Sequence, residues 1–127
     1  MIAIVGCSDD PSRPSHRVAR YLQDAGYRIV PVNPNHEELL GEVCYASLTV
    51  VPESIEIDIV DIFRHPSHTS AMVRDVIERS ERLGRRPVVW TQIGVSSAEA
   101  RSMADAAGLR YVTNRCSMVE HGRLTEE

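Results

Sequence analysis

Five short runs of apolar, largely β-branched residues, separated by longer amphipathic stretches, constrain this chain more than any other feature. They cover residues 2–6, 27–34, 57–63, 87–94 and 109–112. Runs of this length and composition are typical of strands buried on both faces. Strands that alternate with helical patterns predict right-handed βαβ units and a parallel sheet covered by helices. We therefore predict an α/β fold, a three-layer doubly wound domain with a mainly parallel sheet of about five strands.

Helical patterns follow three of the runs. Residues 15–25 carry an apolar stripe and stop before Gly26, which is typical of a helix C-cap. Pro66 suits the first turn of a second helix. A capping box at 96–99 predicts the start of a third, which ends at Gly108. Residues 35–56 are less regular and predict a short strand followed by a turn or short helical piece.

Length and composition predict one domain over residues 1–127. The chain is 43% hydrophobic and 25% charged, as is ordinary for soluble proteins. It has no apolar run of membrane-spanning length and no secretory signal, so we expect a cytoplasmic protein with no membrane partner. A net charge of −4 without a basic stripe argues against a nucleic-acid partner. Exposed apolar helix faces are compatible with a homodimer.

The cysteine and histidine patterns predict no metal site. Cys7, Cys44 and Cys116 form an odd set without C-x-x-C spacing, so we expect reduced thiols. The five histidines show no i, i+4 pair with a carboxylate. We also see no arrangement that predicts catalytic residues.

The loops that follow the predicted strands are the candidate ligand-binding segments. In doubly wound folds, ligands bind beyond the carboxyl ends of the strands, where the strand order reverses. In the first loop, Gly6 permits a tight turn, and Ser8 and Ser12 offer hydroxyls. The following helix N-terminus and Arg13 suit a phosphate. An ordinary strand–helix loop with Asx and proline turns explains the same residues, and the residues alone leave both interpretations open.

The loop after the second strand argues against a dinucleotide. Such a site uses an acid at the end of this strand to hold the ribose, whereas this chain has Asn33 between two prolines. The nearest acids, Glu37 and Glu38, lie further along. Asn33 suits a hydrogen bond to adenine or ribose, and it equally suits a turn.

The third and fourth loops offer weaker signals. Phe63 suits stacking on a base or closing of the core, and Arg64 follows it. Asp61 can orient Arg64 or serve as a buried structural carboxylate. Gly94 stands where backbone could approach a ligand closely.

Five motifs, in this order, carry a resemblance to a known family: "IVGCSDDPSRPSHRVARYL", "YRIVPVNP", "VDIFRHP", "VWTQIGV" and "NRCSMVEHGRL". The chain resembles the small stand-alone CoA-binding proteins, which are similar to the CoA-binding N-terminal domain of succinyl-CoA synthetase alpha subunits. The similarity runs from about residue 2 to residue 124. It implies a Rossmann-like domain that binds coenzyme A or an acyl-CoA across the carboxyl edge of the sheet.

The resemblance also implies which residues meet the ligand. The first loop would hold the phosphates, the second would flank the nucleotide, the third would line the other side of the cleft, and the fourth would lie near the pantetheine arm. In that order, the residues are Gly6, Cys7, Ser8, Ser12 and Arg13; Asn33 and Pro34; Phe63 and Arg64; and Ile93 and Gly94. Arg115 and Cys116 match a motif near the end of the domain.

The chain departs from the family pattern in two respects. It starts directly at the first strand, and Cys7 replaces the middle residue of the usual small turn. The histidine that succinyl-CoA synthetase phosphorylates belongs to a further domain, so no catalytic residue carries over. Cys7 lies near a predicted helix N-terminus, where its pKa could fall and the thiol could form a mixed disulfide with CoA. A small packing residue is the alternative.

The leading hypothesis is thus non-catalytic binding of CoA or an acyl-CoA. A second is an NAD(P)-binding enzyme or redox sensor, in which Glu37 or Glu38 would hold the ribose. A third is a CoA-binding subunit that works with a separate ligase partner.

Overall fold

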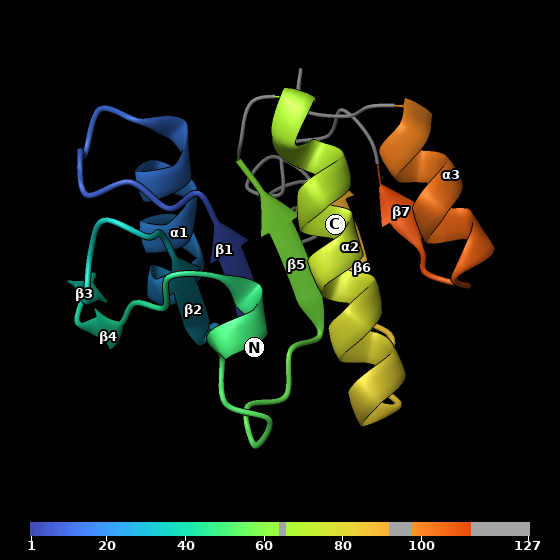
Figure 1. Ribbon diagram of the computed structural model, residues 1–127. Coiled ribbons are helices and arrows are strands. Elements are labelled where there is room, and N and C mark those ends of the chain that lie inside the picture. The colour runs from blue at the N-terminus through green and yellow to red at the C-terminus, as the bar shows by residue number, and fades with distance from the viewer. Residues whose placement is uncertain (64–65, 92–97, 113–127) are drawn as a thin grey trace, which may run out of the picture.

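The computed structural model, shown in Figure 1, describes residues 1–63, 66–91 and 98–112. In that part of the chain, strands and helices alternate as the sequence predicts. The main sheet contains β1 (Ile2–Val5), β2 (Ile29–Val32), β5 (Ile59–Ile62), β6 (Val88–Thr91) and β7 (Tyr111–Val112). The helices are α1 (Pro14–Asp24), α2 (Pro66–Leu83) and α3 (Ala98–Ala106).

All strands of this sheet are parallel, in the order β2-β1-β5-β6-β7. The order reverses at β1, because the chain continues first to β2 on one side and then to β5 on the other. In the ribbon diagram, α1 lies on one face of the sheet, and α2 and α3 lie on the other (Figure 1). The prediction of a Rossmann-like doubly wound α/β fold is confirmed.

The residues of β1 show why the apolar runs are continuous. Ile2 and Ile4 pack with the buried face of α1, while Ala3 and Val5 pack in the larger cluster beneath α2 and α3. All four are almost completely buried. A central parallel strand has no solvent-facing side, so alternation of polar and apolar residues would leave polar groups in the core.

The predicted C-cap of α1 is confirmed. Gly26 adopts a φ of +98°, a conformation that glycine reaches without a Cβ clash. The Tyr27 N–H donates to the Leu22 carbonyl at 3.0 Å, and the Gly26 N–H donates to the Gln23 carbonyl at 3.0 Å. These two hydrogen bonds form a Schellman motif and satisfy carbonyls that the helix end leaves without partners.

A small hairpin, β3 (Glu38–Leu39) and β4 (Glu42–Val43), is absent from the sequence prediction. Its two-residue turn has φ values of +53° at Leu40 and +77° at Gly41, as a type I′ turn requires. The sequence does not predict this turn, because leucine rarely adopts a positive φ. Tertiary contacts stabilise it: Leu40 packs against the cluster beneath α1, and Gln23 Nε2 donates to its carbonyl at 3.0 Å.

The rest of this irregular region agrees better with expectation. The short strand predicted over residues 42–47 is confirmed in part, because β4 lies within it and Tyr45 forms a parallel bridge with Val32. The predicted helical piece is a 3-10 helix, η1 (Leu48–Val50). Ser96 of the predicted capping box lies outside the described residues. No helix in the described ranges is both long and apolar enough to cross a lipid bilayer.

Candidate ligand-binding site

The loops after β1 and β2 meet at the carboxyl edge of the sheet, beside the reversal of strand order. A cavity of about 200 Å³ opens there, on the face that α2 covers. Its lining residues are Val5, Gly6, Val32, Pro34, Ala46, Ser47, Leu48, Met72 and Asp75. Two of the predicted site residues, Gly6 and Pro34, therefore lie in one cavity. The rest of its wall comes from the ends of β1 and β2, from η1 and the segment before it, and from α2. The sequence analysis proposed no site residue in η1, in the segment before it or in α2.

The turn after β1 is tied to the end of β2. Gly6 has a φ of +84°, which only glycine adopts readily. The N–H groups of Gly6 and Cys7 both donate to the Val32 carbonyl, at 2.9 and 3.3 Å. This arrangement fixes the backbone that borders the cavity.

An Asx turn organises the middle of the first loop. Asp10 Oδ1 accepts hydrogen bonds from the Ser12 N–H at 2.9 Å and from the Ser12 hydroxyl at 2.8 Å. The hydrogen bond from the Ser12 backbone is the main reason that the pKa of Asp10 lies below its usual value. The Ser8 hydroxyl accepts from the Asp10 N–H at 3.1 Å. The loop thus contains the Asx turn of the alternative interpretation, and the Ser12 hydroxyl already has an acceptor.

The N-terminus of α1 has no side-chain cap. Arg13 occupies the N-cap position with extended backbone (φ −85°, ψ 142°), its side chain is exposed, and the first turn contains no acid. Pro14 has no N–H, and the Arg17 N–H donates to the Arg13 carbonyl at 3.2 Å. The donors left in this turn are therefore the N–H groups of the buried residues Ser15 and His16. Because the helix dipole favours negative charge, this end of α1 has some of the features of a phosphate site.

Asn33 connects the two loops by its side chain. Its Nδ2 donates to the Cys7 carbonyl at 2.8 Å, and its Oδ1 accepts from the Asn35 N–H at 2.9 Å. Its own N–H donates to the Tyr45 carbonyl at 2.9 Å. Both ends of the amide are therefore used within the protein, which favours the turn interpretation and makes Asn33 a residue that positions the site.

Cys7 contradicts the hypothesis of a reactive thiol. Its side chain is 0% exposed and lies in the cluster beneath α1, with Ile4 and Val18. Burial, with a smaller contribution from Cys44, raises its pKa to about 12. Of the two interpretations, the small packing residue is confirmed and the reactive thiol is wrong, because the thiol faces the apolar core.

The remaining predicted residues divide into two groups. Phe63 is half-buried and packs against the cluster beneath α1, so it helps to close the core. Asp61 is fully buried in the sheet. Arg64, Ile93 and Gly94, together with Arg115 and Cys116, lie outside the described residues.

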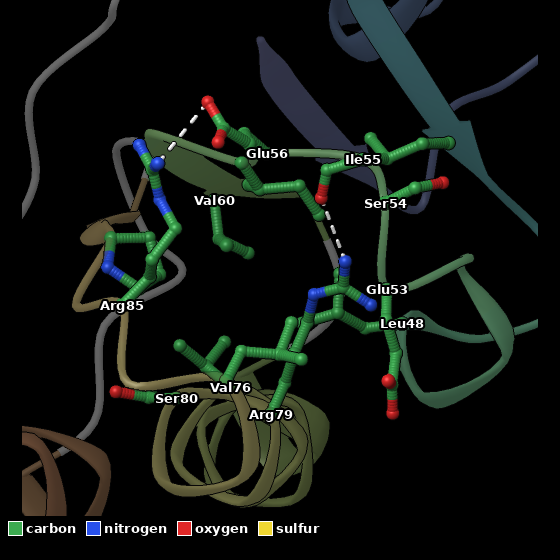
Figure 2. Close-up of a pocket in the computed structure, with 13 residues that line it drawn as sticks. Leu48, Glu53, Ser54, Ile55, Glu56, Val60, Val76, Arg79, Ser80 and Arg85 are labelled. Atoms are coloured by element: carbon green, nitrogen blue, oxygen red, sulfur yellow. Dashed lines mark hydrogen bonds and ion pairs between the residues drawn. The ribbon is translucent and has the colours of Figure 1, made fainter.

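A second cavity, of about 260 Å³, lies at the opposite, amino edge of the sheet (Figure 2). Arg79 is only 6% exposed there, and it donates to the carbonyls of Val51 at 2.7 Å, Pro52 at 2.9 Å and Ile55 at 2.8 Å. The other charged side chains in its wall are also paired: Arg85 with Glu56 at 3.1 Å, and Glu53 with Arg82 at 2.9 Å. Because these charged groups already have partners, the described wall of the amino-edge cavity presents no unpaired charged side chain to a ligand.

No group of three or more histidine, cysteine, aspartate or glutamate side chains that could hold a metal ion is found among the residues described here. The carboxyl edge offers a ligand hydrogen-bonding groups, a helix N-terminus and apolar contact.

Comparison with known proteins shows which family the chain resembles. A family model described as a CoA binding domain matches residues 1–122. The uncharacterized protein YneT of Bacillus subtilis is 38% identical over 120 residues, which cover 94% of this chain and 84% of that protein. A solved structure of a hypothetical protein from Pyrococcus horikoshii is 43% identical to this chain and superposes with a TM-score of 0.89. The match covers 98% of this chain and 82% of the Pyrococcus chain.

A more distant relative is an enzyme. The acetate–CoA ligase (ADP-forming) of Methanocaldococcus jannaschii is 25% identical over 95 residues, which cover 75% of this chain and 13% of the ligase. The chain is homologous to the CoA-binding region of such ligases, and it corresponds to a small part of their length.

Proposed function

The chain belongs to the CoA-binding domain family, and from this premise we propose that it binds coenzyme A or an acyl-CoA at the carboxyl edge of its sheet without catalysing a reaction. The observation that carries the proposal is the cavity beside the reversal of strand order, which the turn at Gly6 borders. Doubly wound folds bind their ligands at this place. We also propose that residues 1–127 act as one domain.

The diphosphate of CoA would lie against the N-terminus of α1. The N–H groups of Ser15 and His16 in the first helical turn would donate to the phosphate oxygens, and the exposed Arg13 guanidinium would add a charge-assisted pair of hydrogen bonds. Ser12 would contribute its N–H or hydroxyl only by giving up its bond to Asp10. Ser8 and Asn33 would act mainly by holding the loops in place.

The nucleotide would occupy the adjoining cavity, where Pro34 offers an apolar surface. The proposed contacts of Phe63 and Arg64 with the other side of the ligand, and of Ile93 and Gly94 with the pantetheine arm, complete the ligand site that the family resemblance implies. The Cys7 side chain would support the first loop from the core, since burial withholds it from the ligand.

The structure offers little support for the dinucleotide alternative. The carboxylates of Glu37 and Glu38 are exposed, Glu38 is part of the hairpin, and the place of the ribose-binding acid is occupied by Asn33. A CoA-binding subunit with a ligase partner remains a second candidate, because the chain is homologous to a 13% portion of a ligase. Recovery of such a partner from native extract by the tagged chain would support that candidate.

The decisive experiment is a thermal-shift and calorimetric titration with CoA, acetyl-CoA, NAD and NADP. CoA at 100 times its Kd should add about 2.7 kcal/mol to the free energy of unfolding, a shift of several degrees. Arg13→Gln should weaken CoA binding about tenfold without lowering the Tm, because it removes one charge-assisted contact. Arg101→Gln, an exposed change on α3, serves as the matched control. Acetyl-CoA should stay intact on incubation.

Two results would contradict the proposal. One is the absence of saturable CoA binding to folded protein. The other is tighter binding of NAD or NADP than of CoA, which would favour the dinucleotide alternative.

A further inference from the structure

Asp75 is the least satisfied polar side chain in the carboxyl-edge cavity. It projects from α2 and lines the cavity together with Met72, Pro34 and Gly6. Its side chain is partly buried. Among the residues that the structure describes, it has no hydrogen-bond or ion-pair partner, although the charged side chains around the amino-edge cavity all have one. A carboxylate in such a place favours a ligand that brings a hydrogen-bond donor.

The electrostatic surroundings of Asp75 give the same indication. Burial, with a smaller contribution from the like charge of Glu78, raises the pKa of its carboxyl group. No cation among the described residues offsets these effects by direct contact. A partly buried titratable group that lines a cavity and has no partner among the described residues is a candidate functional group.

The cavity wall restricts which part of CoA could face Asp75. A phosphate is disfavoured, because it would place negative charge against a carboxylate. Most of the wall is apolar, and the Ser47 hydroxyl already bonds the Thr49 hydroxyl at 2.7 Å. The part of the ligand that faces Asp75 must therefore be compact and apolar on its faces, with a hydrogen-bond donor at its edge. Adenine has this character, since its exocyclic amino group lies at the rim of a flat ring.

The other donors of CoA fit less well. The pantetheine amides belong to an extended, flexible arm, whereas this cavity is compact, at about 200 Å³. The cavity also adjoins the turn at Gly6, so a base held there remains connected to phosphates at the N-terminus of α1.

We propose that Asp75 determines base specificity: its carboxylate accepts a hydrogen bond from the exocyclic amino group of adenine. This inference rests on the proposed function and assigns a residue that selects the nucleotide part of the ligand. The bond would form when the ligand enters and would give the carboxylate a donor that the described part of the chain does not provide.

The test compares adenosine 3′,5′-bisphosphate with inosine 3′,5′-bisphosphate, in which an oxygen replaces the amino group. Wild-type protein should bind the adenosine compound about tenfold more tightly, the effect expected of one hydrogen bond to a charged group. Asp75→Asn should reduce or reverse this preference, since its amide can donate to the 6-oxo group. Asp75→Ala should reduce it without reversal.

Controls separate a specificity role from a structural one. Glu81→Gln, an exposed change on the same helix, should leave the ratio of the two affinities at its wild-type value. Matching Tm values would show that the Asp75 variants are folded.

Failure of the inference and failure of the proposed function give different results. If wild-type protein binds CoA but the affinity ratio is close to one, or is unchanged in Asp75→Asn, the role of Asp75 is overturned and CoA binding stands. If wild-type protein binds neither CoA nor the bisphosphates, both are overturned.

Discussion

The two cavities at opposite edges of the sheet differ in whether their charged side chains are paired, and this difference does not follow their size. The amino-edge cavity is the larger, about 260 Å³ against 200 Å³, yet its charged side chains are paired. The carboxyl-edge cavity contains the carboxylate of Asp75, which has no partner within the described ranges, and the nearby N-terminus of α1 has no side-chain cap. The proposed ligand site is therefore distinguished by its unsatisfied polar groups and not by its volume.

The difference follows from the topology. At the amino edge, Arg79 reaches from α2 to the loop before β5 and satisfies three of its carbonyls. At the carboxyl edge, the strand order reverses between β1 and β5, and the helices α1 and α2 cover opposite faces of the sheet (Figure 1). Ligands of doubly wound folds bind at such a reversal.

The largest expected effect concerns the thiol beneath the carboxyl-edge loop. With a pKa of about 12, Cys7 should react with iodoacetamide roughly 1000-fold more slowly than a free thiol at pH 8. Mass spectrometry of the Cys7 peptide over time measures this rate, and denatured protein provides the control. Rapid labelling, or a mixed disulfide after treatment with oxidised CoA, would mean that the loop opens and is more than a binding turn.

Removal of the arginine at the amino edge should destabilise the protein and leave its ligand site intact. Arg79→Met removes three hydrogen bonds of a buried guanidinium and leaves the buried Val51 carbonyl without this donor, so the free energy of unfolding should fall by about 3 kcal/mol. The Tm should fall by roughly 10 °C. Arg82→Met, whose ion pairs are exposed, should have a much smaller effect. A loss of CoA affinity at temperatures where Arg79→Met is folded would contradict the division of roles.

Filling each cavity separately should affect ligand binding at one edge only. Ala46→Phe places a ring in the carboxyl-edge cavity and should weaken CoA binding roughly 10–100-fold, because the ligand would have to displace it. Ser80→Val, in the wall of the amino-edge cavity, should leave the affinity unchanged. Calorimetry on both variants measures the effect, and the opposite pattern would place the ligand at the amino edge.

The smallest expected effect is the pH dependence of stability that Asp75 causes. Folding raises the pKa of Asp75, so the folded state binds a proton on this carboxyl group more tightly than the unfolded state does. The stability that this proton contributes is lost as pH rises through the folded-state pKa. Asp75→Asn should thus raise the free energy of unfolding at pH 7, by less than about 0.5 kcal/mol for a solvent-screened group. The gain should vanish near pH 3. Urea unfolding at both pH values tests this, and a destabilised variant at pH 7 would show that the carboxylate has a partner.

Much of the fold could be predicted from local pattern. The central strands read as unbroken apolar runs because helices cover both faces, and Gly26 marked the end of α1 because a C-cap needs its positive φ. The hairpin turn at Leu40 escaped prediction, since its conformation depends on contacts with α1 that no local signal records.

The candidate site divides in the same way. The sequence by itself determined the alternation of strands and helices, the loop at Gly6 and the absence of a ribose-binding acid at Asn33. Only the tertiary structure decided that Cys7 faces the core and that Asp75 faces the cavity. Side-chain periodicity reveals which face of an element is buried, but what lies opposite a residue depends on the order of the strands, and that order is set by packing between segments far apart in the chain.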